Sequence, residues 1–346
     1  MKVSNVVKKI YKIFKKDRYA IDFGTSDCVI ISRNDGIILH EPTVLAIDTY
    51  NKKILAVGHD AKVLLGRKSE GLLASRPLKN GGISSLFLAQ TLLKEFVSKC
   101  IPRLKLSYSE FIISVPLGLP SIQKRALIKA LKFVGINNFY MFPKPIAVAL
   151  ASDLPIDQPY GNLIVNLGGG VSEVIIVSMN SVVSHISLQI GGDVLDENIV
   201  NFIRKKYFGY ISNIVAEKVK ISIGSAVLLE EDKTTRITVK DASSGFPKEI
   251  VISGNEIIDP IKSSLYEISN GIKKVIADAA PEIVSDLMNR GGILSGGTAL
   301  LSNIDKFFSK LIGIPFIVVD DPLISAANGT IKVFNKIDEY KHFMNK

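Results

Sequence analysis

Two short glycine turns carry the residue types that suit chemistry on phosphates. The first turn contains Gly24, Thr25, Ser26 and Asp27, and the second contains Gly168, Gly169 and Gly170. Backbone N–H groups of such small turn residues bind phosphate oxygens, and a carboxylate positions Mg²⁺ through water. Asp22 precedes the first turn and is predicted to hold Mg²⁺ in this way. Two such turns that face each other predict a site for a nucleoside triphosphate.

The residue equivalent to Asp22 before the second turn is an amide, Asn166. An amide still accepts a hydrogen bond from a metal-bound water, but it carries no charge. One carboxylate is therefore kept and the other is neutralised, which indicates a nucleotide site with altered chemistry.

Strand-like runs on both sides of each turn must position these residues. Runs 19–22 and 29–33 flank the first turn, and runs 162–166 and 173–179 flank the second. Helices are predicted at 87–99, 120–135 and 256–279, the last capped by Asn255, and 64–75 is expected to be a polar connector. The same order of strands, glycine turn and helices occurs twice. This repetition predicts a duplicated, doubly wound α/β fold that binds its ligand between the halves.

The composition is that of a globular protein, with 47% hydrophobic and 22% charged residues. A length of 346 residues is sufficient for two domains. Cys28 and Cys100 form neither a metal-ligand spacing nor a disulfide framework, which suits a reducing cytosol. Only four histidines are present, and their scatter argues against a metal-centred enzyme. No apolar run approaches the about 20 residues of a membrane span.

The net charge of +10 is concentrated at the N-terminus, where residues 1–20 hold seven lysines and arginines and one acidic residue. This segment is a predicted basic amphipathic helix at 1–18 with an apolar face of Val3, Val6, Val7, Ile10, Ile13 and Phe14. Such a helix lies in a membrane interface with its lysines on anionic lipid. Packing on the body or on a protein partner is the alternative. Nucleic acid is not an expected partner, because the arm has few aromatic residues for stacking.

An ordered series of motifs resembles MreB, the bacterial actin homologue, from about residue 19 to residue 334. The motifs include A-I-D-F-G-T-S (20–26), S-V-P-L-G (114–118), N-L-G-G-G (166–170), G-G-D-V-L-D-E (191–197) and L-S-G-G-T-A-L-L (294–301). A lone glycine triplet is weak evidence of kinship, whereas this series covers most of the chain. It favours MreB over sugar kinases or chaperone ATPases of the same superfamily.

The resemblance implies an α/β, actin-like fold with two lobes, each with a duplicated mixed sheet flanked by helices. Lobe I is expected at 19–145 and 315–346, with a small subdomain at about 34–70. Lobe II is expected at 146–314, with a small subdomain at about 181–250. The implied ligands are ATP or ADP with Mg²⁺. Beyond the two glycine turns, the residues that the resemblance places at the ribose, base and adenosine are Glu217, Lys220, Ser295, Gly296, Gly297 and Thr298, where the family often has a third glycine at the last position.

Three substitutions relative to the family fall around the reacting γ-phosphate. The family usually reads E-E-P where this chain has Pro143-Lys144-Pro145, and its second Glu helps to orient the attacking water. Lys144 has no acceptor for a water proton when it is charged, and it is instead free to pair with the γ-phosphate. Asn166 stands where the family has Asp. Val171 stands where the family has a Thr hydroxyl, and the adjacent Ser172 still carries a hydroxyl. We expect ATP binding with very slow hydrolysis, unless Asp22 alone organises Mg²⁺ and another group holds the water.

The resemblance also implies assembly and location. Members polymerise head to tail into protofilaments, with antiparallel pairing as a further expectation, on the inner face of the cell membrane. The expected partners are other copies of the chain, other MreB paralogues and anionic lipid, in a cytoplasmic protein of cell shape or motility. The alternatives are a non-polymerising paralogue that regulates other MreB filaments and a small-molecule kinase of the same superfamily. Lys144 and Asn166 argue against the kinase, which needs an acid near the acceptor hydroxyl.

Overall fold

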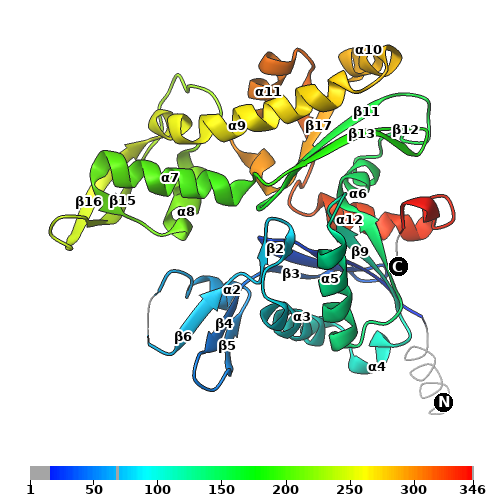
Figure 1. The fold of residues 1–346 in the computed structure, drawn as a ribbon, viewed down its shortest axis with the longest axis horizontal. Coiled ribbons are helices and arrows are strands. Elements are labelled where there is room, and N and C mark those ends of the chain that lie inside the picture. The colour runs from blue at the N-terminus through cyan, green and yellow to red at the C-terminus, as the bar shows by residue number, and fades with distance from the viewer. Residues whose placement is uncertain (1–15, 68–69, 345–346) are drawn as a thin grey trace, which may run out of the picture. The chain divides into compact units, whose positions relative to one another are not determined.

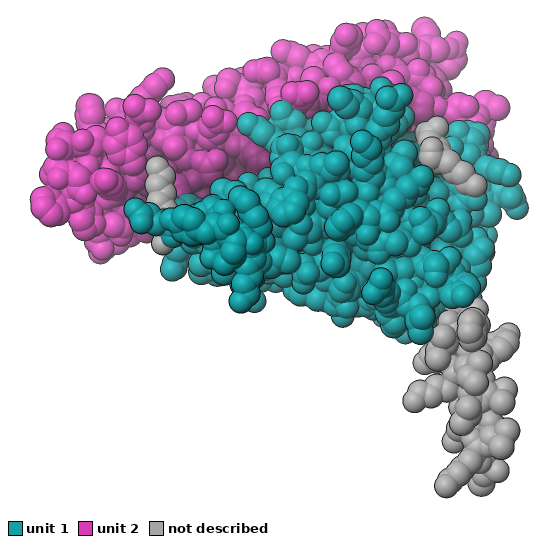
Figure 2. Space-filling view, turned by 60° about the horizontal axis from the view of Figure 1, so that its bottom comes forward, with its two compact units in different colours: residues 1–152, 326–346 teal, residues 153–325 magenta. Residues whose placement is uncertain are grey.

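The computed structural model describes residues 16–67 and 70–344. The chain divides into two compact units, which Figure 2 colours separately. Unit 1 comprises residues 1–152 and 326–346, and unit 2 comprises residues 153–325. The six apolar residues predicted to face a membrane lie outside the described residues. Among the described helices, none is long and apolar enough to cross a membrane.

Unit 1 is built on a five-stranded mixed sheet in the order β10-β9-β1-β2-β3. The central strand β1 runs antiparallel to β2 and parallel to β9. Every residue of β1 after Arg18 is buried, as the apolar run in the sequence requires. The bounds of the strands are β1 (Arg18–Phe23), β2 (Asp27–Ser32), β3 (Gly36–Pro42), β9 (Glu110–Val115) and β10 (Phe139–Pro143).

Unit 2 repeats this topology with a five-stranded sheet in the order β13-β12-β11-β17-β18. Its central strand β11 runs antiparallel to β12 and parallel to β17, as β1 does with β2 and β9. The predicted duplication of a mixed sheet is therefore confirmed. The bounds of the strands are β11 (Asn162–Leu167), β12 (Ser172–Ser178), β13 (Ser181–Leu188), β17 (Gly292–Ser295) and β18 (Phe316–Val318).

Helices pack against both main sheets (Figure 1), and each unit has a large apolar core between them. In unit 1, Leu92 and Phe96 of α3 and Leu131 of α5 pack with Ile21 and Phe111 of the sheet. The helices of unit 1 are α2 (His59–Lys62), α3 (Leu86–Cys100), α4 (Arg103–Leu106), α5 (Ser121–Val134) and α6 (Lys144–Ala151), and α12 (Ser325–Lys332) begins at the last residue of unit 2. The helices of unit 2 are α7 (Gly192–Tyr207), α8 (Asn213–Ile223), α9 (Gly254–Ala277), α10 (Pro281–Arg290) and α11 (Ile304–Ile312).

Each unit also contains small sheets away from its main sheet. Unit 1 has the order β5-β4-β6 and the pair β7-β8, and unit 2 has the order β14-β15-β16. The bounds are β4 (Leu45–Asp48), β5 (Ile54–Val57), β6 (Leu72–Ser75), β7 (Leu78–Lys79), β8 (Gly82–Ile83), β14 (Gly209–Tyr210), β15 (Thr234–Asp241) and β16 (Pro247–Ser253). Short 3₁₀ turns complete the units at Gly297–Leu300, Val333–Asn335 and Lys341–Phe343.

Two local predictions were wrong. Helix α9 begins at Gly254 and its N-cap is Ser253, because Ser253 and Glu256 form a reciprocal capping box. The side chain of Asn255 instead bonds both backbone groups of Leu229. The predicted connector 64–75 ends in strand β6, whose pairing with β4 supplies hydrogen bonds that the local sequence does not reveal.

Candidate functional site

The first glycine turn joins β1 to β2 and is closed by its own backbone. The Gly24 N–H donates to the carbonyl of Asp27 at 3.0 Å. A Cβ at Gly24 would lie 2.9 Å from that same oxygen, so a side chain there would force the turn to shift. The Thr25 hydroxyl is buried and accepts a hydrogen bond from the Gly81 N–H at 3.2 Å. The turn is thus held rigidly, and Gly24, Ser26 and Asp27 keep part of their surface exposed.

Asp22 lies beside this turn and has two partners on one oxygen. Its Oδ1 accepts a hydrogen bond from the Ser114 hydroxyl at 2.7 Å and lies 2.6 Å from Lys144 Nζ. The strand register explains the first contact, because Asp22 and Ser114 are paired across β1 and β9. Lys144 arrives from the other side of β9 as the first residue of α6, directly after β10. Asp22 is only 7% exposed, so this is a buried ion pair.

The two charges that the sequence assigned to separate tasks therefore engage each other. Lys144 was expected at the γ-phosphate and Asp22 at Mg²⁺, and the structure pairs them. The ammonium also lies next to the phosphate turn, since Lys144 Nζ is 3.7 Å from the Cβ position of Gly24. The site of unit 1 thus presents a lysine cation at the start of the turn.

The surroundings of Asp22 do not fit Mg²⁺. An ammonium repels a divalent cation that binds close to it. The Lys144 ammonium also neutralises the carboxylate that would attract the metal. Among the described residues, no group of three or more His, Cys, Asp or Glu side chains is placed to hold a metal ion.

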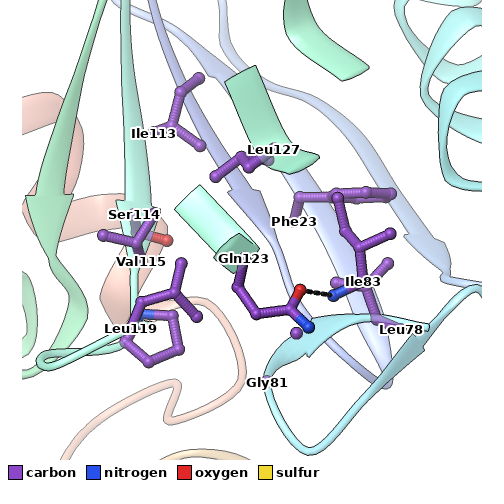
Figure 3. A pocket seen from close by; sticks show the side chains of 12 residues that line it. Phe23, Leu78, Gly81, Ile83, Ile113, Ser114, Val115, Leu119, Gln123 and Leu127 are labelled. Carbon is purple, nitrogen blue, oxygen red and sulfur yellow. Dashed lines mark hydrogen bonds between the residues drawn. The ribbon is translucent and has the colours of Figure 1, made fainter. Parts of the chain in front are cut away.

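A small, mostly apolar pocket in unit 1 has Phe23, the last residue of β1, in its lining (Figure 3). Its volume is about 20 Å³, which is room for about one water molecule and far too little for a nucleotide. Phe23, Ile113 and Leu127 line it, and the Gln123 side-chain carbonyl accepts a hydrogen bond from the Ile83 N–H at 2.8 Å.

The second glycine turn joins β11 to β12 and repeats the geometry of the first. The Gly168 N–H donates to the carbonyl of Val171 at 2.9 Å, and a Cβ at Gly168 would lie 2.9 Å from that oxygen. Gly168 and Gly169 are partly exposed, whereas Gly170 is buried. The second turn therefore offers the same kind of backbone surface as the first.

The start of α7 covers the second turn. The Gly192 N–H donates to the Gly168 carbonyl at 3.1 Å, and the Asp193 N–H donates to the Gly169 carbonyl at 2.8 Å. A Cβ at Gly191 would lie 2.5 Å from the Gly169 carbonyl oxygen. Only glycine permits this approach. Gly191 and Gly192 were not predicted as site residues, although the G-G-D motif contained the signal.

The turn that contains Ser295 to Thr298 packs on the same place. The Thr298 hydroxyl donates to the Gly168 carbonyl at 3.0 Å. Gly296 has φ +84°, and a Cβ there would lie 2.3 Å from the Leu167 carbonyl oxygen. The Ser295 hydroxyl is buried and bonds the Ser325 hydroxyl. Of these residues, which were predicted to lie beside adenosine, Thr298 bonds the second glycine turn directly, and Gly296 packs on Leu167 just before it.

Lys220 and Glu217 lie one turn apart on α8, as predicted. Lys220 Nζ lies 2.7 Å from Asp196 Oδ1 and donates to the Gly192 carbonyl at 3.0 Å. Burial raises the pKa of Asp196 from its usual 3.8 to about 6, against the opposing effect of Lys220, and nearby Glu217 adds to the rise. Lys220 is thus tied to the glycines that cover the second turn. Asp196 is a further residue that the sequence reading did not select.

The altered positions of unit 2 have partners of their own. The Asn166 amide donates to Glu173 Oε2 at 3.4 Å, because the two residues are paired across β11 and β12. The Ser172 hydroxyl donates to the Ile190 carbonyl at 2.6 Å, and Val171 is buried. Glu173 is 3% exposed and was missed by the sequence reading, although the register of a simple hairpin would have placed it opposite Asn166.

Each unit therefore gathers its own set of predicted residues. Unit 1 brings Asp22, the first turn and Lys144 together. Unit 2 brings the second turn, Lys220 and Thr298 together through Gly168 and Gly192.

Comparisons with known proteins agree on one family. The sequence model described as MreB/Mbl protein matches residues 16–342. The cell shape-determining protein MreB of Escherichia coli (strain K12) is 33% identical over 338 residues, which cover 96% of this chain and 97% of that protein. The crystal structure of MreB5 of Spiroplasma citri bound to AMPPNP superposes with a TM-score of 0.90 at 27% identity, over 95% of this chain and 98% of that one.

A more distant structure shares the fold. The MamK double helical filament has a TM-score of 0.74 at 18% identity and covers 92% of this chain and 99% of that one. The duplicated mixed sheets, the paired glycine turns and these matches lead to one assignment: the chain has an actin-like fold and belongs to the MreB/Mbl family.

Proposed function

We propose that this chain binds ATP and ADP at its two glycine turns, hydrolyses ATP very slowly and assembles into cytoskeletal filaments. Support for nucleotide binding comes from the two rigid turns, each with partly exposed backbone of the kind that binds phosphate. The similar MreB5 of Spiroplasma citri is bound to AMPPNP, an ATP analogue. Lys220, Glu217 and the turn 295–298 are proposed to hold the nucleoside.

One observation carries the proposal of slow hydrolysis, namely the pairing of Lys144 with Asp22. A charged lysine at the position of the family glutamate cannot accept a proton from the attacking water. The Ser172 hydroxyl donates to Ile190, so its proton is not available to hold that water. Loss of a general base typically costs about 10²- to 10⁴-fold in rate.

Filament formation and membrane location are proposed on different grounds. The relatives are cell shape-determining proteins, and head-to-tail copies of one surface form an open filament. The predicted basic helix at 1–18 supports attachment to anionic lipid on the cytoplasmic face. Deletion of residues 1–15 is expected to abolish sedimentation of the protein with anionic liposomes. Unchanged sedimentation would contradict this assignment.

The test is phosphate release by the full chain with ATP, together with negative-stain microscopy of the same sample. Wild-type protein is expected to form filaments and to release phosphate far more slowly than MreB of Escherichia coli does under the same conditions. Lys144→Glu should raise the rate at least about tenfold, since it restores an acceptor for the water proton. Lys144→Met is the matched control, because it removes the cation without supplying a base, and its rate should stay low.

Other outcomes separate the alternatives. Release at the rate of the Escherichia coli protein would contradict slow hydrolysis. Nucleotide binding without filaments would favour a regulatory paralogue, and phosphate transfer to a small hydroxyl compound would favour a kinase.

A further inference from the structure

We infer that this chain binds the nucleoside triphosphate without a divalent cation, and that the Lys144 ammonium replaces the metal at the first phosphate turn. This inference rests on the proposed nucleotide binding and specifies the ionic form of the ligand. It starts from a disagreement between the residues present and the metal that the fold implies.

The first step concerns the carboxylate. Oδ1 of Asp22 receives both the Ser114 hydroxyl at 2.7 Å and the Lys144 ammonium at 2.6 Å. Ser114 lies on β9, which flanks β1, and Lys144 begins α6 directly after β10, which flanks β9 on its other side. A hydrated Mg²⁺ needs carboxylate oxygens with open lone pairs and negative charge. In Asp22, Oδ1 is engaged twice and the Lys144 ammonium balances the charge of the carboxylate.

The second step concerns net charge. Asp22 and Lys144 together carry no formal charge, and Asn166, the equivalent of Asp22 in unit 2, is neutral. The carboxylate that Asn166 contacts belongs to Glu173, which is only 3% exposed and already accepts the amide. The formal negative charge left at these four positions is therefore that of Glu173 alone, and it is buried and hydrogen-bonded to Asn166.

The third step concerns the cation that is present. Lys144 Nζ is 3.7 Å from the Cβ position of Gly24, so its positive charge lies at the first residue of the phosphate turn. An ammonium with three donors is a well-suited partner for phosphate oxygens. Asp22 holds that ammonium by an ion pair, which orients it before any ligand arrives. The turn thus contains a fixed ammonium that can donate hydrogen bonds to phosphate oxygens, although its charge is balanced by Asp22 until a phosphate competes for it.

The experiment is calorimetric titration of the full chain with ATP, once in excess EDTA and once in millimolar MgCl₂. The expected dissociation constants differ by less than threefold. Lys144→Met should weaken ATP binding in EDTA at least tenfold. Addition of Mg²⁺ should restore most of the affinity that this variant has lost. Lys144→Arg keeps a cation and should bind ATP equally under both conditions.

The matched control is Lys105→Met. Lys105 forms an ion pair with the buried Asp17 in unit 1, and neither residue is part of the first glycine turn. This variant should bind ATP like the wild type in EDTA and in Mg²⁺. A Mg²⁺ requirement in this variant would show that loss of any buried lysine creates it, and would overturn the role of Lys144.

Failure of the inference differs from failure of the proposed function. A wild-type affinity that falls threefold or more when EDTA replaces Mg²⁺ overturns the inference and leaves nucleotide binding intact. No ATP binding under either condition removes the proposed function and the inference with it. If the Lys144 variants do not fold, the wild-type comparison alone decides.

Discussion

The two glycine turns share a backbone and differ in their side chains. In each, the first glycine donates to the carbonyl three residues later, at 3.0 Å from Gly24 to Asp27 and at 2.9 Å from Gly168 to Val171. In each, a Cβ on that glycine would lie 2.9 Å from the same carbonyl. The backbone geometry of the turn is therefore the same in both units. The side chains that decide the chemistry have changed independently of it.

The buried carboxylate beside each turn lies on the first strand of the hairpin in unit 1 and on the second strand in unit 2. In unit 1 the pair across the hairpin is Asp22 with Val29, and in unit 2 it is Asn166 with Glu173. The first acid is paired with a lysine, and the second accepts an amide from its neighbour. Each half of the molecule thus satisfies its carboxylate internally. Engagement of both carboxylates costs little affinity in a site that binds phosphate through backbone N–H groups and a lysine. A site that must activate water loses its proton acceptors in the same arrangement.

Each unit also contains one buried Lys–Asp pair beside its turn. Lys144 and Asp22 lie at the first turn, and Lys220 and Asp196 lie beside the second. Burial raises the pKa of Asp196 to about 6 even though Lys220 opposes the rise, so this carboxylate takes up a proton more readily than an exposed Asp does.

The largest expected effect comes from breaking these two ion pairs. Lys144→Met should lower the free energy of unfolding by about 4 kcal/mol, since it leaves a buried carboxylate unpaired. Lys220→Met should cost only about 1 to 2 kcal/mol at pH 7, because Asp196 can protonate. Urea unfolding of the full chain measures both. The double change Asp22→Asn with Lys144→Met should recover most of the loss, and equal costs for the two lysines would contradict the distinction.

A second test asks whether the turn of unit 2 is packed as tightly as its glycines indicate. Gly296→Ala should cost about 3 kcal/mol, because it combines a positive φ with a Cβ only 2.3 Å from the Leu167 carbonyl oxygen. Gly313→Ala is the control: its φ is +80° and its Cβ would have no neighbour within 4 Å. That change should cost about 1 kcal/mol. Equal losses of stability in the two variants on thermal unfolding would show that the turn backbone shifts to accommodate the new side chain.

The smallest expected effect is a pH dependence confined to unit 2. The pKa of Asp196 is raised to about 6 in the folded protein, so the folded state binds more protons than the unfolded chain between about pH 4 and 6. This contribution to stability is complete below about pH 4 and is lost as pH rises through 6. Relative to the wild type, Asp196→Asn should therefore gain about 2 kcal/mol between pH 4 and 7. Urea unfolding across this range measures the gain, and a difference that stays constant would contradict the raised pKa.

The fold was largely predictable because its signals are local. Apolar runs around small turn residues predicted both hairpins, and the repeated order of elements predicted the duplicated sheet. The start of α9 was misjudged because two polar residues, Ser253 and Asn255, are both suitable caps. The reciprocal bond from Glu256 decides between them. Strand β6 was missed because its partner, β4, lies more than twenty residues earlier in the chain.

The sequence by itself determined the family, the two turns and the three altered residues around the phosphate, because these depend on residue identity and order. Tertiary structure decided which of those residues act on one another. Lys144 and Asp22 are more than a hundred residues apart in the chain, and only the parallel pairing of β1, β9 and β10 brings them within 2.6 Å. Asn166 and Glu173 meet through the hairpin register. Charges that the sequence shows separately become pairs in the sheet, because a buried carboxylate is stable only with a partner.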